Sequence, residues 1–506
     1  MRVLPSISYP VEVQSRYFTE KKVEKRFSAK TLFAVGLGSL ILLSLSFALV
    51  LSLFGLKYAI LMLALLVAVP TVGVIVGNPR AGIIILLVSA YFLMWIYRMG
   101  IDFALGTLMD GMYALLIFGF FLNQKFRPNW KIFKTPLAII ILIWVGYLVL
   151  QVGNPNAESQ LAWIFNIRSW AVVALLYFVF SYYISTLSFV RTILNLWMFL
   201  SFLGALNAFK QEHFGFFAFE EATFNDPLVQ ALLFINGTWR KFSIFSDPVA
   251  FSYNMAISTI FCICVLTSPN TKKKKALYFF LGCFFTTTML YSATRASYVL
   301  LPGALILYII MNLNRRVLAF GIVGAAFMFV LINIPTGNVT LYRFQSAFKP
   351  SDDASYKVRK NNQKKIQPYI QSHPFGGGLG STGASGVRFA PYSFLAQLPP
   401  DSGYFRVAVE LGWIGLIIFC SMFFIALRQG ILNYYQIKDP ELKSYCLAMT
   451  LIVFALNIGS FPQEALVQFP ISIYFFLFLA LINITLKLDK EKQLQEVENQ
   501  KSLLSC

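Results

Sequence analysis

The sequence predicts an all-α integral membrane protein with about 14 transmembrane helices (12–14), a periplasmic cap of short helices and a long periplasmic loop. Three observations support this fold class. Hydrophobic residues make up 58% of the 506 residues and charged residues only 13%, whereas about a quarter of a soluble chain is charged. Mean hydropathy is +0.67. Aromatic residues reach 16%, which suits interfacial belts. This composition excludes a soluble multi-domain enzyme and a disordered chain.

Apolar runs justify the helices in order, because a span needs about 20 residues to cross about 30 Å of hydrocarbon. Two of the runs, the third and the tenth, are short, which gives the lower end of the range. The candidate spans are 31–55, 58–77, 81–97, 102–122, 136–153, 168–186, 190–208, 247–267, 276–293, 297–313, 317–334, 403–427, 443–460 and 468–486.

The basic residues predict the orientation, because cytoplasmic loops carry an excess of Lys and Arg. One set of loops holds the N-terminal segment, the Lys272–Lys275 run, the Arg315–Arg316 pair and the C-terminal lysines. We therefore expect a bacterial inner membrane protein with both termini cytoplasmic. The first apolar run is too long for a signal peptide. The expected organisation is a cytoplasmic segment (1–30), transmembrane helices (31–208), a periplasmic amphipathic segment (209–246), transmembrane helices (247–334), a long periplasmic loop (335–402), transmembrane helices (403–486) and a cytoplasmic tail (487–506).

The two long outer segments predict the cap. The segment 209–246 contains HFGFFAFEEATF and PLVQALLFI, which indicate a helix lying in the membrane interface. The loop 335–402 begins with a basic, helical pattern and ends at the glycine-rich stretch 376–380. That stretch lacks the Lys-Ser/Thr of a nucleotide-binding P-loop. Loops of this length are usually functional or disordered.

Cofactors and metals are not expected. The six cysteines form no CxxC pair or ligand cluster, so neither disulfides nor a zinc site is predicted. No paired-carboxylate site appears beside Asp401. Asp110 is a lone acid within a span and is interpreted as a satisfied structural residue. The net charge of +20 is attributed to topology and anionic lipids, and no nucleic acid partner is expected.

Polar residues at helix mouths are the candidates for chemistry, because they are costly at membrane depth. Several cations facing few acids require an anion, and a planar guanidinium pairs bidentately with phosphate oxygens. The alternative is that such arginines reach lipid headgroups. Arg295 is the exception, since its small neighbours in SATRASY suit a packed interior. The outer-face candidates are Arg168, Arg240, Lys241, Arg295, His373, Asp401, Arg406 and Glu410.

Four stretches together resemble the O-antigen ligase/polymerase superfamily of bacterial envelope proteins, the Wzy polymerases and WaaL ligases. TWRKFSIFSDPVAFSYNMAI is similar to its arginine-containing lead into a helix, and YSATRASYVLLPGALILYI to its arginine turn. VRKNNQKKIQPYIQSHPFGGGLGS resembles the glycine-rich end of its long periplasmic loop. PPDSGYFRVAVELGWIGLIIF resembles the re-entry into the membrane. These stretches cover roughly residues 235–420.

The resemblance implies a metal-independent, inverting glycosyl transfer at the periplasmic face, from a sugar chain on undecaprenyl diphosphate. Arg240 and Arg295 match the arginines that grip and stabilise the leaving diphosphate. Asp401 occupies the position of the family's loop histidine, which favours a polymerase-type or divergent member with a carboxylate base. His373 matches the more variable loop histidine, taken first as structural and second as catalytic. The further substrate-binding candidates are Arg168, Lys241, Arg359, Arg406, Glu410 and Tyr404.

Three functions stay open at this stage. The first is a polymerase of undecaprenyl-diphosphate-linked repeat units for an exopolysaccharide, capsule or O-antigen. The second is a ligase that moves a finished glycan onto lipid A core or a protein. The third is a lipid-linked oligosaccharide flippase, which should carry cations through the bilayer depth. The expected partners are the lipid-diphosphate-linked oligosaccharide, membrane lipids and a chain-length regulator or other polysaccharide assembly proteins.

Overall fold

The computed structural model describes residues 44–53, 72–100, 105–235, 237–337, 339–348, 354–397 and 402–504. The chain divides into two compact units, Met1–Thr71 and Val72–Cys506. The described part of the first unit is the helix Ser44–Leu53. Most of the two expected spans between residues 31 and 77 therefore lies outside the described residues. All other described residues belong to the second unit.

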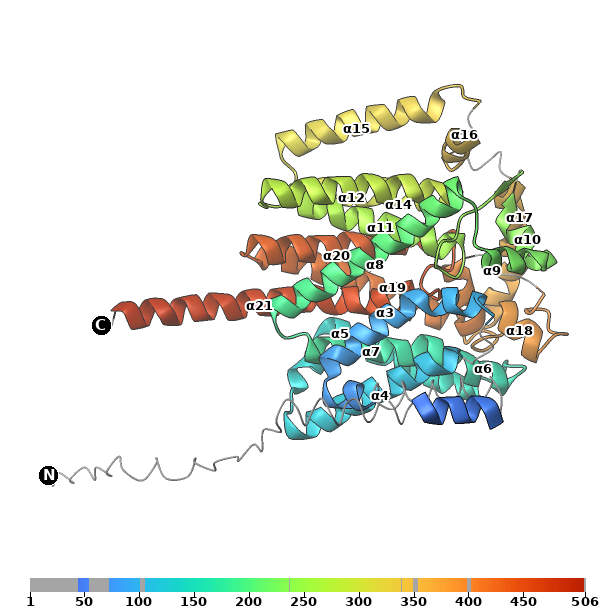
Figure 1. The fold of residues 1–506 in the computed structure, drawn as a ribbon, viewed down its shortest axis with the longest axis horizontal. Coiled ribbons are helices and arrows are strands. Elements are labelled where there is room, and N and C mark those ends of the chain that lie inside the picture. Colours follow the sequence, from blue (N-terminus) through green and yellow to red (C-terminus); the bar gives the residue numbers. More distant parts are fainter. Residues whose placement is uncertain are drawn as a thin grey trace. The chain divides into compact units, whose positions relative to one another are not determined.

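The second unit is built almost entirely of helices, with one short hairpin in which β1 and β2 pair antiparallel (Figure 1). Its elements are α3 (Pro79–Arg98), α4 (Leu105–Phe126), η2 (Trp130–Lys134), α5 (Pro136–Leu150), η3 (Gln151–Gly153), α6 (Gln160–Ile167), η4 (Arg168–Val172), α7 (Val173–Tyr183), α8 (Leu187–His213), α9 (Ala218–Glu221), η5 (Ala222–Asn225), α10 (Pro227–Leu233), β1 (Phe234–Ile235), β2 (Thr238–Trp239), α11 (Pro248–Thr267), α12 (Lys272–Tyr291), α13 (Arg295–Tyr298), α14 (Leu300–Met311), α15 (Arg315–Asn333), α16 (Val339–Ser346), α17 (Ala354–Ser372), α18 (Gly383–Phe389), α19 (Gly403–Gln436), α20 (Pro440–Gly459) and α21 (Ile471–Leu504).

Ten helices of the described chain are long and apolar enough to cross a membrane. The all-α membrane class is therefore confirmed, whereas the described residues do not establish about 14 spans. Two expected spans form helices that fall outside the ten. The helix α12 begins with four lysines, and the apolar helix Arg295–Met311 is short. The helices α19 and α21 are longer than expected, and α21 continues through most of the segment expected as a separate tail.

The core lies where α11, α20 and α21 pack together, and most of each of these helices is buried. The helix α11 begins at Pro248, and the Asp247 carboxylate caps it by accepting from the backbone N–H groups of Val249 and Ala250 at 2.7 and 3.0 Å. The helix α15 is the opposite case, because none of its apolar window is buried. Its large side chains, such as Phe327 and Phe329, are exposed, as suits a helix that faces lipid.

Short elements replace the single interfacial helix that was expected within 209–246. The long helix α8 continues to His213 and ends before Gly215, whose φ of 81° favours glycine. Pro227 then starts α10, because a proline cannot continue a preceding helix. The chain therefore breaks into α9, η5, α10 and the hairpin. These elements gather with α16, α17 and α18 beyond one set of long-helix ends (Figure 1).

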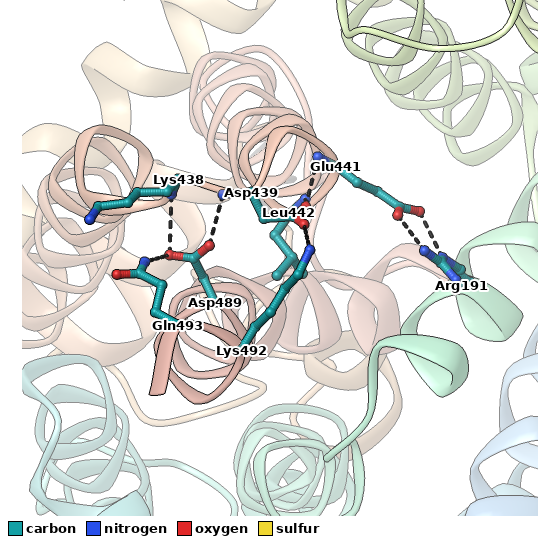
Figure 2. A network of polar contacts seen from close by, with 8 residues as sticks. All are labelled: Arg191, Lys438, Asp439, Glu441, Leu442, Asp489, Lys492 and Gln493. Carbon is teal, nitrogen blue, oxygen red and sulfur yellow. Dashed lines mark hydrogen bonds and ion pairs between the residues drawn. The ribbon is translucent and has the colours of Figure 1, made fainter. Parts of the chain in front are cut away.

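A polar network ties the helices together at their other ends (Figure 2). Arg191, near the start of α8, pairs with Glu441 at the start of α20 through two hydrogen bonds of 2.8 and 2.5 Å. The buried Asp489 of α21 accepts from the backbone N–H groups of Lys438 and Asp439 at 3.1 and 2.8 Å. Asp489 thereby fixes the turn between α19 and α20 to α21.

We predict that Asp489→Ala destabilises the protein by about 2–4 kcal/mol, because it leaves two partly buried backbone N–H groups without their acceptor. The measurement is the unfolding temperature of the purified protein in detergent. Asp489→Asn should lose less stability, since its amide oxygen can still accept a backbone hydrogen bond. The control is Glu491→Ala, which removes an exposed partner of Lys487 and should change the stability by under about 0.5 kcal/mol. Equal unfolding temperatures for Asp489→Ala and Glu491→Ala would contradict the prediction.

Candidate functional site

The side chain of Arg240 holds the turn that carries Arg295. Arg240 follows β2 and is buried. Its Nε donates to the Ser292 carbonyl at 3.0 Å, and its Nη2 donates to the Thr294 hydroxyl at 2.9 Å. Its Nη1 donates to the Leu232 carbonyl at 3.2 Å. A guanidinium can bridge these groups because its five N–H donors lie in one rigid plane. Two stretches that the sequence singled out therefore meet here.

The turn between α12 and α13 is tightly constructed. Ala293 has a φ of 51°, in the left-handed region that costs an L-residue about 1–2 kcal/mol. The Thr294 N–H donates to the Ser292 hydroxyl at 3.1 Å, and the Thr294 hydroxyl donates to the Pro248 carbonyl at 3.2 Å. These bonds fix the position of Arg295, which is half-buried at the start of α13. Its neighbours Thr294 and Ser297 are buried, while the substrate role of Arg295 stays a prediction.

A third arginine reaches the same region from α16. The Arg343 Nη2 donates across the hairpin to the Ile235 carbonyl at 2.9 Å and to the Thr238 hydroxyl at 2.8 Å. The next residue, Phe344, packs its ring against Tyr298 of α13, with ring centroids 5.6 Å apart. The helix α16 therefore contacts both elements that carry the other two arginines.

We call Arg240, Arg295 and Arg343 the arginine cluster. Tyr298, three residues after Arg295, is buried and packs against Phe344, the residue that follows Arg343. The sequence did not single out Arg343, because its segment LYRFQS carries no motif and only its place in the outer loop marked it. Guanidinium groups gathered in this way suit a phosphate-containing anion.

Lys241 is placed beside the cluster but is engaged with an acid. Its Nζ lies 3.2 Å from a carboxylate oxygen of Glu212 and donates to the Trp239 carbonyl at 3.0 Å. Its backbone N–H donates to the Tyr291 carbonyl, next to the arginine turn. Lys241 thus joins α8 to α12, and its substrate role stays a prediction.

The glycine-rich stretch docks on α19. The Gly377 N–H donates to the Val409 carbonyl at 2.8 Å, and the Gly378 N–H donates to the Glu410 carbonyl at 2.9 Å. The buried Glu410 carboxylate accepts from the Gly380 N–H at 2.9 Å and from the Thr382 hydroxyl at 2.5 Å. Charge-assisted bonds of this kind are about twice as strong as neutral ones. Glu410 therefore fixes the loop to the helix.

Gly412 makes this docking possible. It has a φ of 68°, a kink inside α19 that only glycine adopts readily. A side-chain carbon at this position would lie 1.9 Å from the Pro374 carbonyl oxygen. The Tyr147 hydroxyl of α5 donates to the Leu411 carbonyl at 2.6 Å beside the kink. The segment Glu410–Gly412 thus has a structural role, because it allows the glycine-rich stretch to pack directly on the backbone of α19.

Arg406 links the same helix to the segment that follows α20. Its Nε lies 3.1 Å from Glu410, and its Nη1 lies 2.6 Å from Glu464. Two carboxylates therefore balance one guanidinium. Tyr404, two residues earlier in α19, donates its hydroxyl to the side-chain oxygen of Asn457. These contacts give Arg406, Glu410 and Tyr404 partners within the fold, and their contact with a substrate stays a prediction.

His373 is held within its own loop. Its ring stacks on Tyr369 with centroids 3.9 Å apart, and its Nδ1 donates to the Tyr369 carbonyl at 2.9 Å. This geometry supports the structural interpretation, while a base role stays a prediction. Burial raises the pKa of the Tyr369 phenol, and the negative charge of Glu158 raises it further. Glu158, Ser393 and the glycine-rich stretch line a small pocket beside this loop.

Arg168 differs from its expected setting. It was expected to open a span, but it lies in a π-helical turn within a helix that runs from Gln160 to Tyr183. The helix begins earlier because Gln160–Ile167 is also helical. The Nη1 of Arg168 pairs with Asp110 of α4 at 2.6 Å. The interpretation of Asp110 as a satisfied residue is therefore confirmed.

Two predicted site residues, Asp401 and Arg359, have side chains outside the part of the chain that the structure describes. Asp401 lies outside the described residues. Arg359 lies in α17, but its side chain is outside the described part. The roles expected for both stay predictions.

The helix α11 joins the arginine cluster to the segment that follows Asp401. Its first residue, Pro248, accepts from the arginine turn. Tyr253 lies about 7.5 Å further along the helix axis and donates to the Gly459 carbonyl at 2.9 Å. The next carbonyl, that of Ser460, accepts from the Ser402 hydroxyl at 3.4 Å. The segment that starts α19 is therefore connected, through Gly459 and Ser460, to α11, which also contacts the turn between α12 and α13.

Among the described residues, no group of three or more His, Cys, Asp and Glu side chains is placed to hold a metal ion.

This arrangement defines a multi-pass helical membrane protein with an arginine-rich site at the ends of its helices. The family model described as O-antigen ligase (Wzy_C) matches residues 278–420, which include the arginine turn, α16, the glycine-rich stretch and the kinked start of α19. The resemblance to the O-antigen ligase/polymerase superfamily is therefore confirmed. The match covers less than a third of the chain, and Arg240 lies outside it. A search of curated proteins finds no match.

The family match indicates ligase/polymerase-type activity, that of a membrane glycosyltransferase-like enzyme. It also implies a lipid-linked polysaccharide substrate in the membrane.

We predict that Glu410→Ala undocks the glycine-rich stretch and destabilises the protein by about 3–5 kcal/mol, because it leaves two loop donors without their acceptor and the buried Arg406 with one carboxylate in place of two. The measurements are the unfolding temperature and the protease sensitivity of residues 373–397. The control is Glu464→Gln, which removes the less buried partner of Arg406 and leaves the loop bonds intact. A stable, protease-resistant Glu410→Ala protein would refute the docking role.

Proposed function

We propose that this protein polymerises oligosaccharide repeat units carried on undecaprenyl diphosphate, for an exopolysaccharide, capsule or O-antigen. The observation that carries the proposal is that Arg240 donates hydrogen bonds to the turn before Arg295. These bonds bring two arginines from separate stretches of the sequence close together. The superfamily match to the segment with Arg295 supports the class of reaction.

The arginine cluster fits the charge that this reaction develops. When the bond between the anomeric carbon and the diphosphate breaks, the diphosphate leaves with the electron pair. Fixed cations stabilise that charge because they need no reorganisation during the reaction. Arg240 acts mainly on the turn, since three of its donors are bound to protein groups. Arg295, positioned by that turn, is the residue we assign to the diphosphate.

The acceptor requires a base in the same step. The acceptor hydroxyl oxygen attacks the anomeric carbon from the face opposite the diphosphate and gives up its proton. We assign this proton to the carboxylate of Asp401, which takes the place of the family's histidine. The inner-membrane location and the periplasmic position of this site belong to the same proposal.

A ligase is the second candidate, because the matching family model is described as O-antigen ligase. Both reactions use the same donor and leaving group. They differ in the acceptor, which is a second carrier-linked chain for a polymerase and lipid A core or a protein for a ligase.

The test is deletion of the gene in its native host, followed by mass analysis of the carrier-linked glycans. We expect single repeat units on the carrier and no polymer. Arg295→Ala at normal protein levels should restore less than about 1% of the polymer, because the loss of one charge-stabilising donor costs about 100-fold or more in rate. Asp401→Asn should likewise restore little polymer, because an amide cannot accept the proton of the acceptor hydroxyl.

The matched control is Arg388→Ala, since Arg388 lies in α18 and stacks on Phe165 and Phe389 away from the cluster. It should restore normal polymer. Long polymer stranded on the carrier in the deletion strain would establish the ligase instead. Full-length polymer with Arg295→Ala would refute both candidates.

A further inference from the structure

The segment 241–247 connects Arg240 to α11, and it is neither helix nor strand. Its residues Phe242, Ser243 and Phe245 are buried. Ser243 has a φ of 56°, in the left-handed region that a residue with a side chain rarely adopts. Buried backbone groups need hydrogen-bond partners, and a segment without regular secondary structure has few of its own. The conformation of this segment therefore depends on side chains from other elements.

Arg98, the last residue of α3, supplies two of these partners. Its Nη1 donates to the Phe245 carbonyl and its Nη2 donates to the Ser246 carbonyl, both at 2.6 Å. Its guanidinium carbon lies 4.1 Å from the centroid of the Phe242 ring, a distance that suits a cation–π interaction. Because the guanidinium is planar and rigid, these contacts fix both the position and the direction of the segment.

Two further side chains hold the segment against α3. The side-chain oxygen of Gln211 in α8 accepts from the Ser243 N–H at 2.9 Å, and its amide donates to the buried carboxylate of Glu220 at 3.0 Å. Glu220 in α9 also accepts from Trp95 Nε1 at 3.3 Å. Trp95 lies in α3 three residues before Arg98, on the same side of the helix. The end of α3 and the segment are therefore parts of one polar network.

The same segment leads directly to the arginine turn. Phe242, which Arg98 contacts, follows two residues after Arg240, a separation of about 7 Å along an extended chain. Arg240 donates to two groups of the turn that precedes Arg295. A shift of the segment therefore moves Arg240, and through Arg240 it moves the turn.

We infer that Arg98 is a positioning residue of the donor site, which acts through Arg240 on Arg295. This inference rests on the proposed function, because that function assigns Arg295 to the diphosphate of the donor. It gives α3, which lies outside the matched residues 278–420, a part in the reaction. Arg98 does not bind the substrate in this assignment, since both of its terminal nitrogens donate to the segment.

The test uses the full-length protein in lipid nanodiscs with a lipid-linked oligosaccharide, and it measures kcat per folded protein and the donor KM. Arg98→Gln should lower kcat by about 10–100-fold with a smaller change in KM, because a misplacement of about 1 Å costs about 100-fold. Arg98→Lys should recover part of kcat, since it restores the charge without the planar fork.

The matched control is Arg80→Gln, at the other end of α3. Arg80 also donates to a neutral group, the Ser185 hydroxyl at 2.9 Å, but it does not contact the segment. Arg80→Gln should leave kcat within about twofold of the parent. If it lowers kcat as far as Arg98→Gln does, the effect belongs to α3 as a whole and the inference is overturned.

A double-mutant cycle separates positioning from general support of the fold. Because the effect runs through Arg240, Arg98→Gln should lower kcat by less than about twofold when Arg240→Gln is already present. The same loss in both backgrounds would mean that Arg98 acts independently of Arg240, which overturns the inference. Asp489→Ala weakens the fold at the other helix ends and should leave kcat per folded protein within about twofold. A loss equal to that of Arg98→Gln would assign the effect to stability alone and overturn the inference.

A comparison with Arg295 distinguishes this inference from the proposed function. If Arg295→Gln loses turnover while Arg98→Gln keeps the parent kcat, this inference fails and the proposed function stands. If Arg295→Gln itself keeps the parent kcat, the proposed function fails.

Discussion

The buried carboxylate of Glu410 is the interaction on which the outer part of the fold depends. It accepts from the glycine-rich stretch on one side and from Arg406 on the other, and Arg406 also pairs with Glu464 in the segment that follows α20. A buried carboxylate is costly unless each oxygen is bound. Here both oxygens accept hydrogen bonds, so the charge that would oppose folding instead fixes a loop, a kinked helix and a neighbouring helix end to one another.

The arginine cluster follows a different rule. Arg240 uses its donors on backbone carbonyls and a hydroxyl, and Arg343 uses one nitrogen on neutral groups. Three arginines elsewhere in the unit, Arg168, Arg191 and Arg406, pair with acids. A site that binds an anion must keep its positive charge, and neutral acceptors orient a guanidinium without cancelling that charge. Neutral partners alone do not mark a binding residue, since Arg98 also donates to the carbonyls of Phe245 and Ser246.

The sequence predicted much of this site in outline. The runs around α11, α20 and the start of α19 were predicted to within a few residues, because lipid crossing imposes both length and composition. The arginine turn was expected from SATRASY and its small neighbours. Arg343 and Glu464 were missed, because their importance comes from contacts with segments far away in the chain. The π-helical turn at Arg168 was missed for a similar reason, since its charge is satisfied by Asp110 on another helix.

The sequence by itself determined the membrane class, and it predicted the long segments between spans and the residue types of the site, because hydropathy and local motifs can be recognised along the chain. Only the tertiary structure decided which charges are paired and which are not. The sequence offered Glu410 as a candidate for substrate contact, and in the fold its carboxylate accepts from Gly380 and Thr382. Such partners lie tens of residues apart, and packing, which brings them within hydrogen-bond distance, sets the balance between structural and functional charge.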